Sequence, residues 1–140
     1  MAQENLEVVR HVIDAFNRED VDGALAYFHR KVEWLGPAER PGEHYKGHRG
    51  IRKLASLWGE NFDEHRLDVE RLIDVGDEVL VVAYERTRSK GSSETIEQQI
   101  GYVWRVRNGG EAERVQAYSS WEAALEEVGM SEQDVHMDPS

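Results

Sequence analysis

The chain has 140 residues, a length that fits one domain with a single hydrophobic core. It contains no cysteine, which excludes disulfide bonds, thiolate nucleophiles and thiolate metal sites. The net charge of −11 argues against binding to nucleic acid or to an anionic membrane through a broad basic surface. No apolar run approaches the roughly 20 residues that span a bilayer, and no signal-peptide pattern is present, so we expect a cytoplasmic protein.

Apolar residues recur at helical spacing in three segments of the first half of the chain. The periodicity predicts helices over 4–16, over 21–28 and from near 48 to 62. Between the second and third of these helices, alternation over 32–35 predicts a short strand. The segment 36–47 holds both prolines that precede the tail and predicts a loop.

The second half of the chain alternates at the period of a β-strand. Strands are predicted over 67–74, 78–88, 94–106 and 112–119. The turn between the last two contains Asn-Gly-Gly at 108–110, a strong hairpin signal. A final short helix follows and ends at a glycine.

Helices grouped before an antiparallel meander predict an α+β fold. We expect a conical barrel, in which a curved antiparallel sheet packs against three N-terminal helices and a short C-terminal helix follows. Residues 1–129 are predicted to form one domain, and 130–140 a flexible acidic tail.

The strand over 94–106 suggests a pocket wall. One of its faces carries Ile96, Gln98, Ile100, Tyr102, Trp104 and Val106. An amide such as Gln98 between two isoleucines is unusual in a solid core, because a buried amide needs hydrogen-bond partners. This face is therefore predicted to look into a hollow between the sheet and the helices.

Most aromatic residues lie on faces that are predicted to look inward. Apolar walls with a few polar groups are typical of small-molecule pockets. The predicted ligand-binding residues are Phe16, Tyr27, Trp34, Tyr45, Trp58, Tyr84, Gln98, Tyr102, Trp104 and Tyr118. The same side chains also suit a packed core, and both interpretations stay open.

Four segments together resemble a known superfamily. They are the helix end AFNREDVDGALAYFH, the strand KVEWLGP, the helix entry YKGHRGI and the hairpin VWRVRNGGEAERVQAY. Their order resembles the nuclear transport factor 2-like (cystatin-like) superfamily, and within it the SnoaL-like relatives of polyketide cyclases and ketosteroid isomerases. The resemblance covers about residues 4–129. It implies a conical α+β barrel with an open pocket, and commonly a homodimer.

The catalytic groups of these relatives are not matched here. The isomerases need a carboxylate base where Trp34 stands and an oxyanion-hole tyrosine where Val12 stands. The base of the cyclases, an aspartate after the last strand, corresponds to Ser120. Proton abstraction beside a carbonyl needs a positioned base, so the resemblance leaves it open whether this protein is an enzyme.

Two residues are weak catalytic candidates. His44 could act as a base if it closes over the pocket mouth, although a solvated loop histidine is the more ordinary interpretation. Arg86 could meet an anionic ligand, or it could pair with Glu97 across the hairpin. The four-residue spacing of His44 and His48 suits metal ligands only on a helix, and we expect no metal. No cofactor fingerprint is present, and no cofactor is expected.

The sequence leaves two functions open. The first is a protein that binds a small, largely apolar molecule without the usual catalytic carboxylates. The alternative is a cyclase-, isomerase- or hydrolase-type enzyme that acts on a small organic substrate through a histidine at the pocket mouth. In either case we expect a homodimer through the wetter sheet face, which carries Gln99, Val103 and Arg105.

Overall fold

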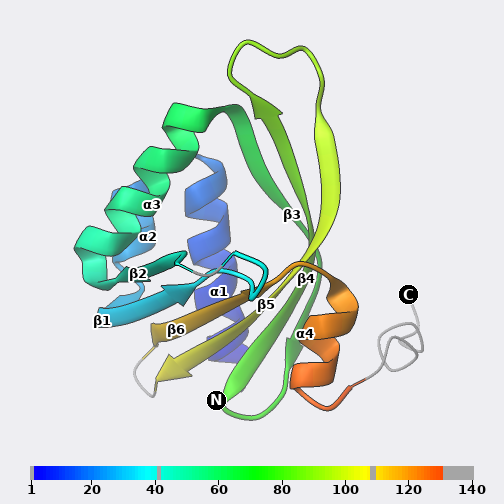
Figure 1. Ribbon diagram of the computed structural model, residues 1–140. Coiled ribbons are helices and arrows are strands. Elements are labelled where there is room, and N and C mark those ends of the chain that lie inside the picture. Colours follow the sequence, from blue (N-terminus) through cyan, green and yellow to red (C-terminus); the bar gives the residue numbers. More distant parts are fainter. Residues whose placement is uncertain (1, 41, 108–109, 131–140) are drawn as a thin grey trace.

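The structure, a computed structural model, describes residues 2–40, 42–107 and 110–130 (Figure 1). Its helices are α1 (Ala2–Asn17), α2 (Val21–Leu25), α3 (Gly47–Asn61) and α4 (Trp121–Glu127). Its strands are β1 (Phe28–Leu35), β2 (His44–Lys46), β3 (Phe62–Asp74), β4 (Glu78–Ser89), β5 (Ile96–Arg107) and β6 (Glu111–Tyr118). No helix in the described ranges is long and apolar enough to cross a membrane.

The strands form one curved sheet in the order β2-β1-β6-β5-β4-β3. The predicted meander is confirmed, because β3, β4, β5 and β6 pair with one another antiparallel. The sheet is nevertheless mixed, since β1 lies parallel to β6. The α+β architecture with a short C-terminal helix is also confirmed. The Asn108–Gly109 part of the predicted hairpin turn lies outside the described residues, as does 131–140 of the predicted tail.

Several element boundaries differ from the prediction. Helix α2 is shorter than the apolar pattern over 21–28, and Phe28 begins β1 instead. The cause is strand pairing, because Phe28 aligns with Ala112 and the Ala112 amide donates to the Tyr27 carbonyl. Strand β3 begins at Phe62, before the predicted range, and β2 forms inside the predicted loop.

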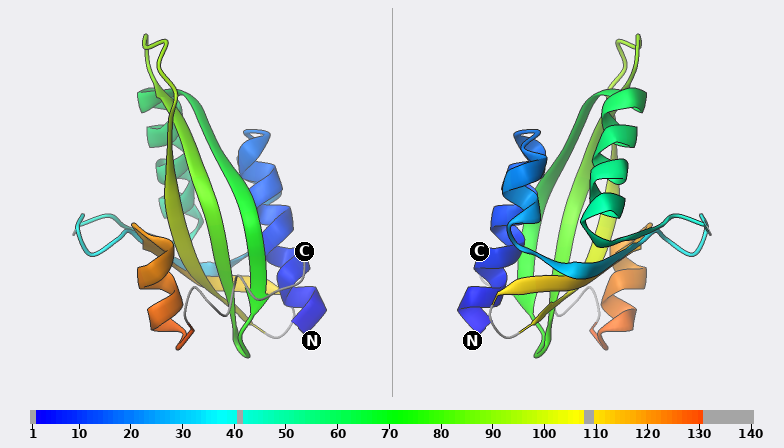
Figure 2. Two further views of the ribbon diagram at one scale, coloured as in Figure 1. Left: turned by 90° about the vertical axis from the view of Figure 1, so that its right-hand side faces the viewer. Right: turned by 90° about the vertical axis from the view of Figure 1, so that its left-hand side faces the viewer.

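The sheet is covered on both faces. Helix α1 and helix α4 lie on opposite sides of the long strands β3 to β5 (Figure 2). The larger core lies between the sheet and helices α1 to α3. A second, smaller cluster lies under α4 and contains Leu80, Val82 and Val103, with Met130 packed against it. The predicted dimer face therefore has Val103 buried under α4.

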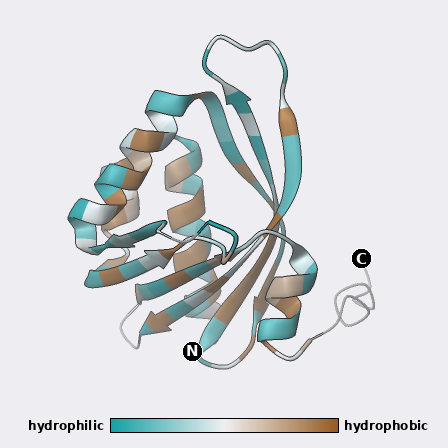
Figure 3. Ribbon diagram, viewed as in Figure 1, coloured by the Kyte–Doolittle hydropathy of each residue, from teal (hydrophilic) through white to brown (hydrophobic). Residues whose placement is uncertain are grey.

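The solvent exposure of the inward face of β5 changes along the length of the strand. Ile100, Tyr102, Trp104 and Val106 point inward, as predicted, but they are buried in the main core. Gln98 is exposed, and Ile96 has 50% of its surface exposed. Both lie near the end of the β4–β5 hairpin, which extends past the helices at the top of Figure 1. Hydrophobic segments in Figure 3 accordingly concentrate below this hairpin.

Candidate functional site

Six aromatic rings occupy the space between the concave sheet face and the helices. They belong to Phe16, Phe28, Trp34, Trp58, Tyr102 and Trp104. The ring centroid of Trp34 lies 5.5–6.4 Å from that of each of the other five. Contacts at these distances match the density of protein cores. The expected open hollow is thus corrected, because the aromatic rings that were to line it largely fill it.

A small inner cavity remains within this cluster. Its volume is about 20 Å³, and it is lined by Ile13, Phe16, Asn17, Trp34, Trp58, His65, Leu67, Tyr102 and Trp104. A volume of this size accommodates one water-sized group, since about 10–15 Å³ on this measure suffices.

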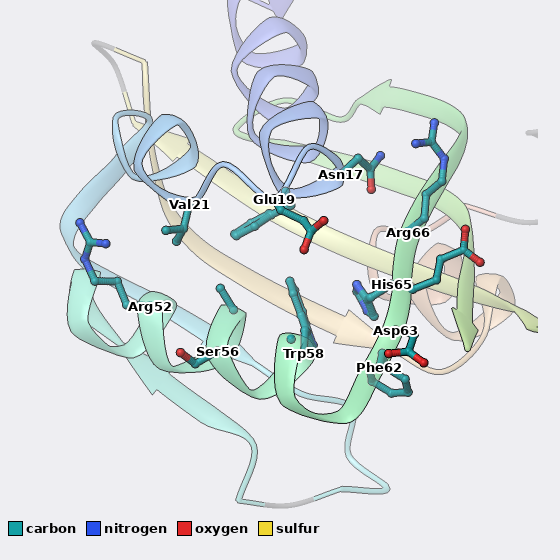
Figure 4. A pocket seen from close by; sticks show the side chains of 14 residues that line it. Asn17, Glu19, Val21, Arg52, Ser56, Trp58, Phe62, Asp63, His65 and Arg66 are labelled. Carbon is teal, nitrogen blue, oxygen red and sulfur yellow. The ribbon is translucent and has the colours of Figure 1, made fainter. Parts of the chain in front are cut away.

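A wider cleft lies outside the inner cavity, between α1, α2, α3 and the beginning of β3 (Figure 4). Its volume is about 620 Å³. Its lining residues are Phe16, Asn17, Glu19, Val21, Arg52, Ala55, Ser56, Trp58, Gly59, Phe62, Asp63, Glu64, His65 and Arg66. The cleft and the inner cavity share Phe16, Asn17, Trp58 and His65, so these four side chains form the boundary between them.

The two arginines at the rim of the cleft are already paired with carboxylates. Arg52 donates to Asp22 at 2.6 Å, and Arg66 donates to Asp68 at 2.8 Å. A cation that has a carboxylate partner offers little net charge to an incoming anion. The rim is therefore better suited to an uncharged molecule than to an anionic one.

A histidine–carboxylate pair lies at the boundary between the cleft and the inner cavity. His65 Nε2 lies 3.0 Å from Glu85 Oε2, and the two side chains are only 13% and 15% exposed. Gln98 Nε2 donates to the other oxygen, Oε1, at 3.4 Å. This is the one histidine–carboxylate pair among the described residues in which both side chains are largely buried.

Strand alternation explains how the pair is placed. Val79, Val81 and Ala83 face the main core from β4, and Glu85 is the next residue on that face. On β3, His65 precedes Leu67, which packs against the same core. Leu67 pairs with Glu85 across the ladder, which brings the neighbouring His65 to the carboxylate.

The pair also sets the electrostatics of the site. Burial is the largest single influence on the pKa of Glu85 and raises it, but the hydrogen bonds from His65 and Gln98, together with nearby positive charge, outweigh it, and the net pKa lies below the usual value. Burial, together with the charge of Glu85, raises the pKa of Tyr102 far above its usual range. Tyr102 therefore keeps its hydroxyl proton, while Glu85 is a carboxylate.

The imidazole of His65 stacks on the indole of Trp58. Their ring centroids are 4.3 Å apart, with an interplanar angle of 15°. Figure 4 shows Trp58 reaching from α3 and His65 from β3 toward each other. If the Nε2 hydrogen is donated to Glu85, the lone pair lies on Nδ1, and His65 in this tautomer is a base.

Asn17 fixes the end of α1 beside the pair. Its side-chain amide donates to the Leu67 carbonyl at 2.9 Å and accepts from the Leu67 amide at 2.9 Å. These two bonds reproduce the pairing of a neighbouring strand, because β3 is an edge strand. They hold α1 against β3 two residues beyond His65.

The structure brings together half of the predicted ligand-binding residues. The inner cavity is lined by Phe16, Trp34, Trp58, Tyr102 and Trp104. Gln98 lies outside both cavities and contacts Glu85 instead.

Tyr27 and Tyr45 lie elsewhere on the main core. Tyr27 stacks on His11 of α1, with ring centroids 5.2 Å apart. Tyr45 pairs with Trp34 across the β1–β2 ladder. Both pack against the core without lining either cavity.

Tyr84 and Tyr118 lie on the opposite face of the sheet, and their predicted place on the pocket wall is corrected. Tyr84 contacts Trp121 of α4, with ring centroids 5.0 Å apart. Tyr118 packs against the cluster under α4. Burial and the nearby carboxylate of Glu127 raise the pKa of Tyr118 to about 12.

The two weak catalytic candidates are both paired with carboxylates at the surface. His44 Nε2 lies 2.9 Å from Glu33 Oε2, outside both cavities. Arg86 lies 3.4 Å from both Asp68 and Glu97, which is the cross-hairpin pairing that was the alternative interpretation. His48 contacts the Phe28 carbonyl at 2.9 Å.

The positions that the resemblance assigned to catalytic groups are structural here. Val12 and Trp34 are buried in the main core. Ser120 is the N-cap of α4, and its hydroxyl accepts from the Ala123 amide at 3.1 Å. The described residues therefore supply no carboxylate or tyrosine at these three positions.

Sequence reasoning missed His65, Glu85 and Asn17. For His65, the predicted strand began at 67, and extending its alternation back by one step would have placed the histidine on the inward face. For Glu85, alternation left two equally apolar faces of β4 to choose between. Asn17 ended a helix pattern and gave no signal of its own.

Solved structures share this fold. TerC, co-crystallised with polyporic acid, matches with a TM-score of 0.75 and 24% identity, covering 89% of this chain and 98% of TerC. A protein of Catenulispora acidiphila with a ketosteroid isomerase-like fold, in complex with trimethylamine, matches with a TM-score of 0.73 and 18% identity. The match covers 89% of this chain and 93% of that protein. A nuclear transport factor 2-like protein of Burkholderia xenovorans matches with a TM-score of 0.70 and 26% identity. The match covers 91% of this chain and 97% of that protein. The fold is thus of the nuclear transport factor 2-like class.

Within this class the family can be assigned. The profile of the SnoaL-like domain matches residues 9–114, which include α2, α3, β1 to β5 and the His65–Glu85 pair. The chain therefore belongs to the SnoaL-like domain family. No curated protein sequence matches it.

Proposed function

We propose that this protein binds a small, uncharged and largely apolar organic molecule in the cleft between α1, α3 and β3. The proposal is carried by the stacked Trp58–His65 pair, which gives the cleft a flat aromatic surface at its inner end. The cleft volume of about 620 Å³ lies within the range of small-molecule pockets. The carboxylate-paired arginines at its rim favour an uncharged ligand.

Two proteins of the same fold support the part of the proposal that concerns a small organic ligand. TerC was co-crystallised with polyporic acid, and the Catenulispora protein is in complex with trimethylamine. Both are similar to this chain over nearly its whole length, so small organic molecules are a reasonable class of ligand for it.

Calorimetric titration with acetophenone and β-tetralone tests the binding. We expect saturable binding, and we expect Trp58→Ala to weaken it by about tenfold, because the ligand loses an aromatic contact and apolar surface. Trp121→Ala is the matched control, since it removes an indole from the opposite face of the sheet. Absence of saturable binding to the wild-type protein, or equal weakening by both substitutions, would contradict the proposal.

A second function, proton transfer on the bound molecule, is favoured by the His65–Glu85 pair. In the tautomer described above, Nδ1 can accept a proton from a carbon next to a carbonyl, and the Glu85 carboxylate stabilises the imidazolium that forms. This arrangement would replace the carboxylate bases that the chain lacks at Trp34 and Ser120 with a histidine base.

Deuterium exchange into β-tetralone tests the second function. Proton NMR in heavy water follows loss of the hydrogens beside the carbonyl, and we expect the protein to accelerate it above the buffer rate. His65→Gln should reduce the protein-dependent rate by about a hundredfold or more. His44→Gln is the matched control, because it breaks a histidine–glutamate pair outside the cleft. If β-tetralone binds but exchanges no faster than in buffer, proton transfer is excluded and binding stands.

A further inference from the structure

Trp104 carries a buried hydrogen-bond donor that nothing in the described part of the protein satisfies. Its side chain is 1% exposed, and among the described residues its Nε1 is the one buried side-chain polar atom without a partner. A buried indole N–H normally has an acceptor, and leaving it without one is unfavourable because the group has lost its hydrogen bond to water. Such a group in a native fold calls for an explanation.

The residues in direct contact with Trp104 are apolar or aromatic, and no described residue accepts a hydrogen bond from its indole N–H. Its neighbours across the sheet ladders are Val79 and Val115. Its indole stacks on Phe28, with centroids 5.9 Å apart, and meets Trp34 edge-on at 5.8 Å. Trp104 also lines the inner cavity, which is the free space nearest to this side chain among those described above.

We infer that the indole N–H of Trp104 anchors the ligand by donating to an oxygen atom that enters the inner cavity. The inference rests on the proposed binding of a small molecule in the adjoining cleft. The cavity, at about 20 Å³, has room for one oxygen-sized group, while the remainder of the ligand stays in the cleft beyond Trp58 and His65.

The chemistry around the cavity selects the kind of oxygen. The Tyr102 hydroxyl, which lines the same cavity, keeps its proton and so adds a second donor, whereas the nearby Glu85 is a carboxylate that repels an anionic oxygen. The described lining contains no lysine or arginine to balance a charged ligand group. The occupant is therefore a neutral carbonyl compound, a ketone or aldehyde on a flat apolar frame.

A pair of probes of equal shape tests this assignment. Acetophenone carries a carbonyl where α-methylstyrene carries a methylene group, so only acetophenone can accept a hydrogen bond. Their dissociation constants are measured with the wild type, Trp104→Phe and Trp34→Phe. Trp34 is the control because it lines the same cavity and loses the same ring volume.

We expect Trp104→Phe to weaken the binding of acetophenone about two- to tenfold more than the binding of α-methylstyrene, which is the effect of one hydrogen bond. Trp34→Phe should change both constants by the same factor. The inference is overturned if Trp104→Phe and Trp34→Phe have the same effect on the ratio of the acetophenone and α-methylstyrene dissociation constants. In that case both probes still bind the wild type, and the proposed function stands.

A second measurement needs no folded variant at position 104. In a protein with 15N-labelled indole groups, acetophenone should shift the Trp104 Nε1–H resonance downfield, and α-methylstyrene should not. Equal shifts with both probes, or none with acetophenone at saturation, overturn the inference. Failure of both probes to bind overturns the inference and the proposed function together.

Discussion

At Glu85, burial raises the carboxyl pKa, whereas the hydrogen bonds from His65 and Gln98 and the nearby positive charges lower it, and together they prevail. The folded-state pKa lies below the unfolded value of about 4.5, so ionised Glu85 stabilises the fold above that pH. The contribution is lost as the pH falls through the folded-state pKa. The His65–Glu85 pair is thus part of the acid stability of the protein.

We predict that Glu85→Gln makes the free energy of unfolding less dependent on pH in the acid range. Urea unfolding, measured from neutral pH down to about pH 3, should show the wild type losing its advantage over the variant as the pH falls. Glu33→Gln is the control, because its exposed pair with His44 should contribute less than about 1 kcal/mol. Parallel curves for the wild type and Glu85→Gln would contradict the prediction.

Residues at the site were only partly predictable from the sequence. The aromatic residues Trp34, Trp58 and Trp104 were recognised because bulky apolar side chains mark inward faces. The His65–Glu85 pair was not, since both faces of residues 79–83 are apolar and alternation cannot choose between them. Helix α4 is the cause, because it buries Leu80 and Val82 on the face that would otherwise be polar.

Helix α4 sits against the sheet at a position that requires glycine. A Cβ on Gly101 would lie 2.5 Å from the Ala124 Cβ and 3.3 Å from the Ser120 carbonyl oxygen. Neither group can move without shifting the helix. The approach of α4 to β5 is therefore set by the absence of a side chain at residue 101.

We predict that Gly101→Ala lowers the free energy of unfolding by about 1–3 kcal/mol through overpacking. Ala124→Gly, which removes the opposing methyl, should cost about 1 kcal/mol alone. Chemical denaturation of the double variant should show less destabilisation than the sum of the two, because the clash is removed. Strict additivity would show that the contact between Gly101 and Ala124 does not limit the packing.

Most helices and strands followed from local periodicity, and the exceptions are those set by distant partners. The meander over β3 to β6 was predicted because each turn joins neighbouring strands. The beginning of β1 at Phe28 depends on pairing with β6, far along the chain, and residues 21–28 by themselves fit a helix. Local pattern carries no information about a parallel partner of that kind.

For the whole molecule, the sheet face beyond α4 is the surface where we expect a second copy to bind. Arg86 pairs with Asp68 and Glu97 on this face, and Gln99 and Arg105 are exposed there. Exposed polar side chains and ion pairs are compatible with a moderately polar dimer interface.

We predict a homodimer through this face, with a mass by light scattering of twice that of one chain. Arg86→Glu should shift the equilibrium toward the monomer, since it reverses a charge in the interface, whereas Glu94→Gln at the nearby turn should not. A monomer at all concentrations tested would contradict the expectation. A dimer unaffected by Arg86→Glu would place the interface elsewhere.

The bidentate contact between Asn17 and Leu67 has a consequence for solubility. The outer side of an edge strand presents free amide and carbonyl groups, and these can template the addition of a strand from another molecule. Here the Leu67 groups at the centre of that strand are already occupied by a side chain of the same chain. Asn17 therefore blocks strand addition by another molecule at this point of the edge strand β3, beside the cleft in which the ligand is proposed to bind.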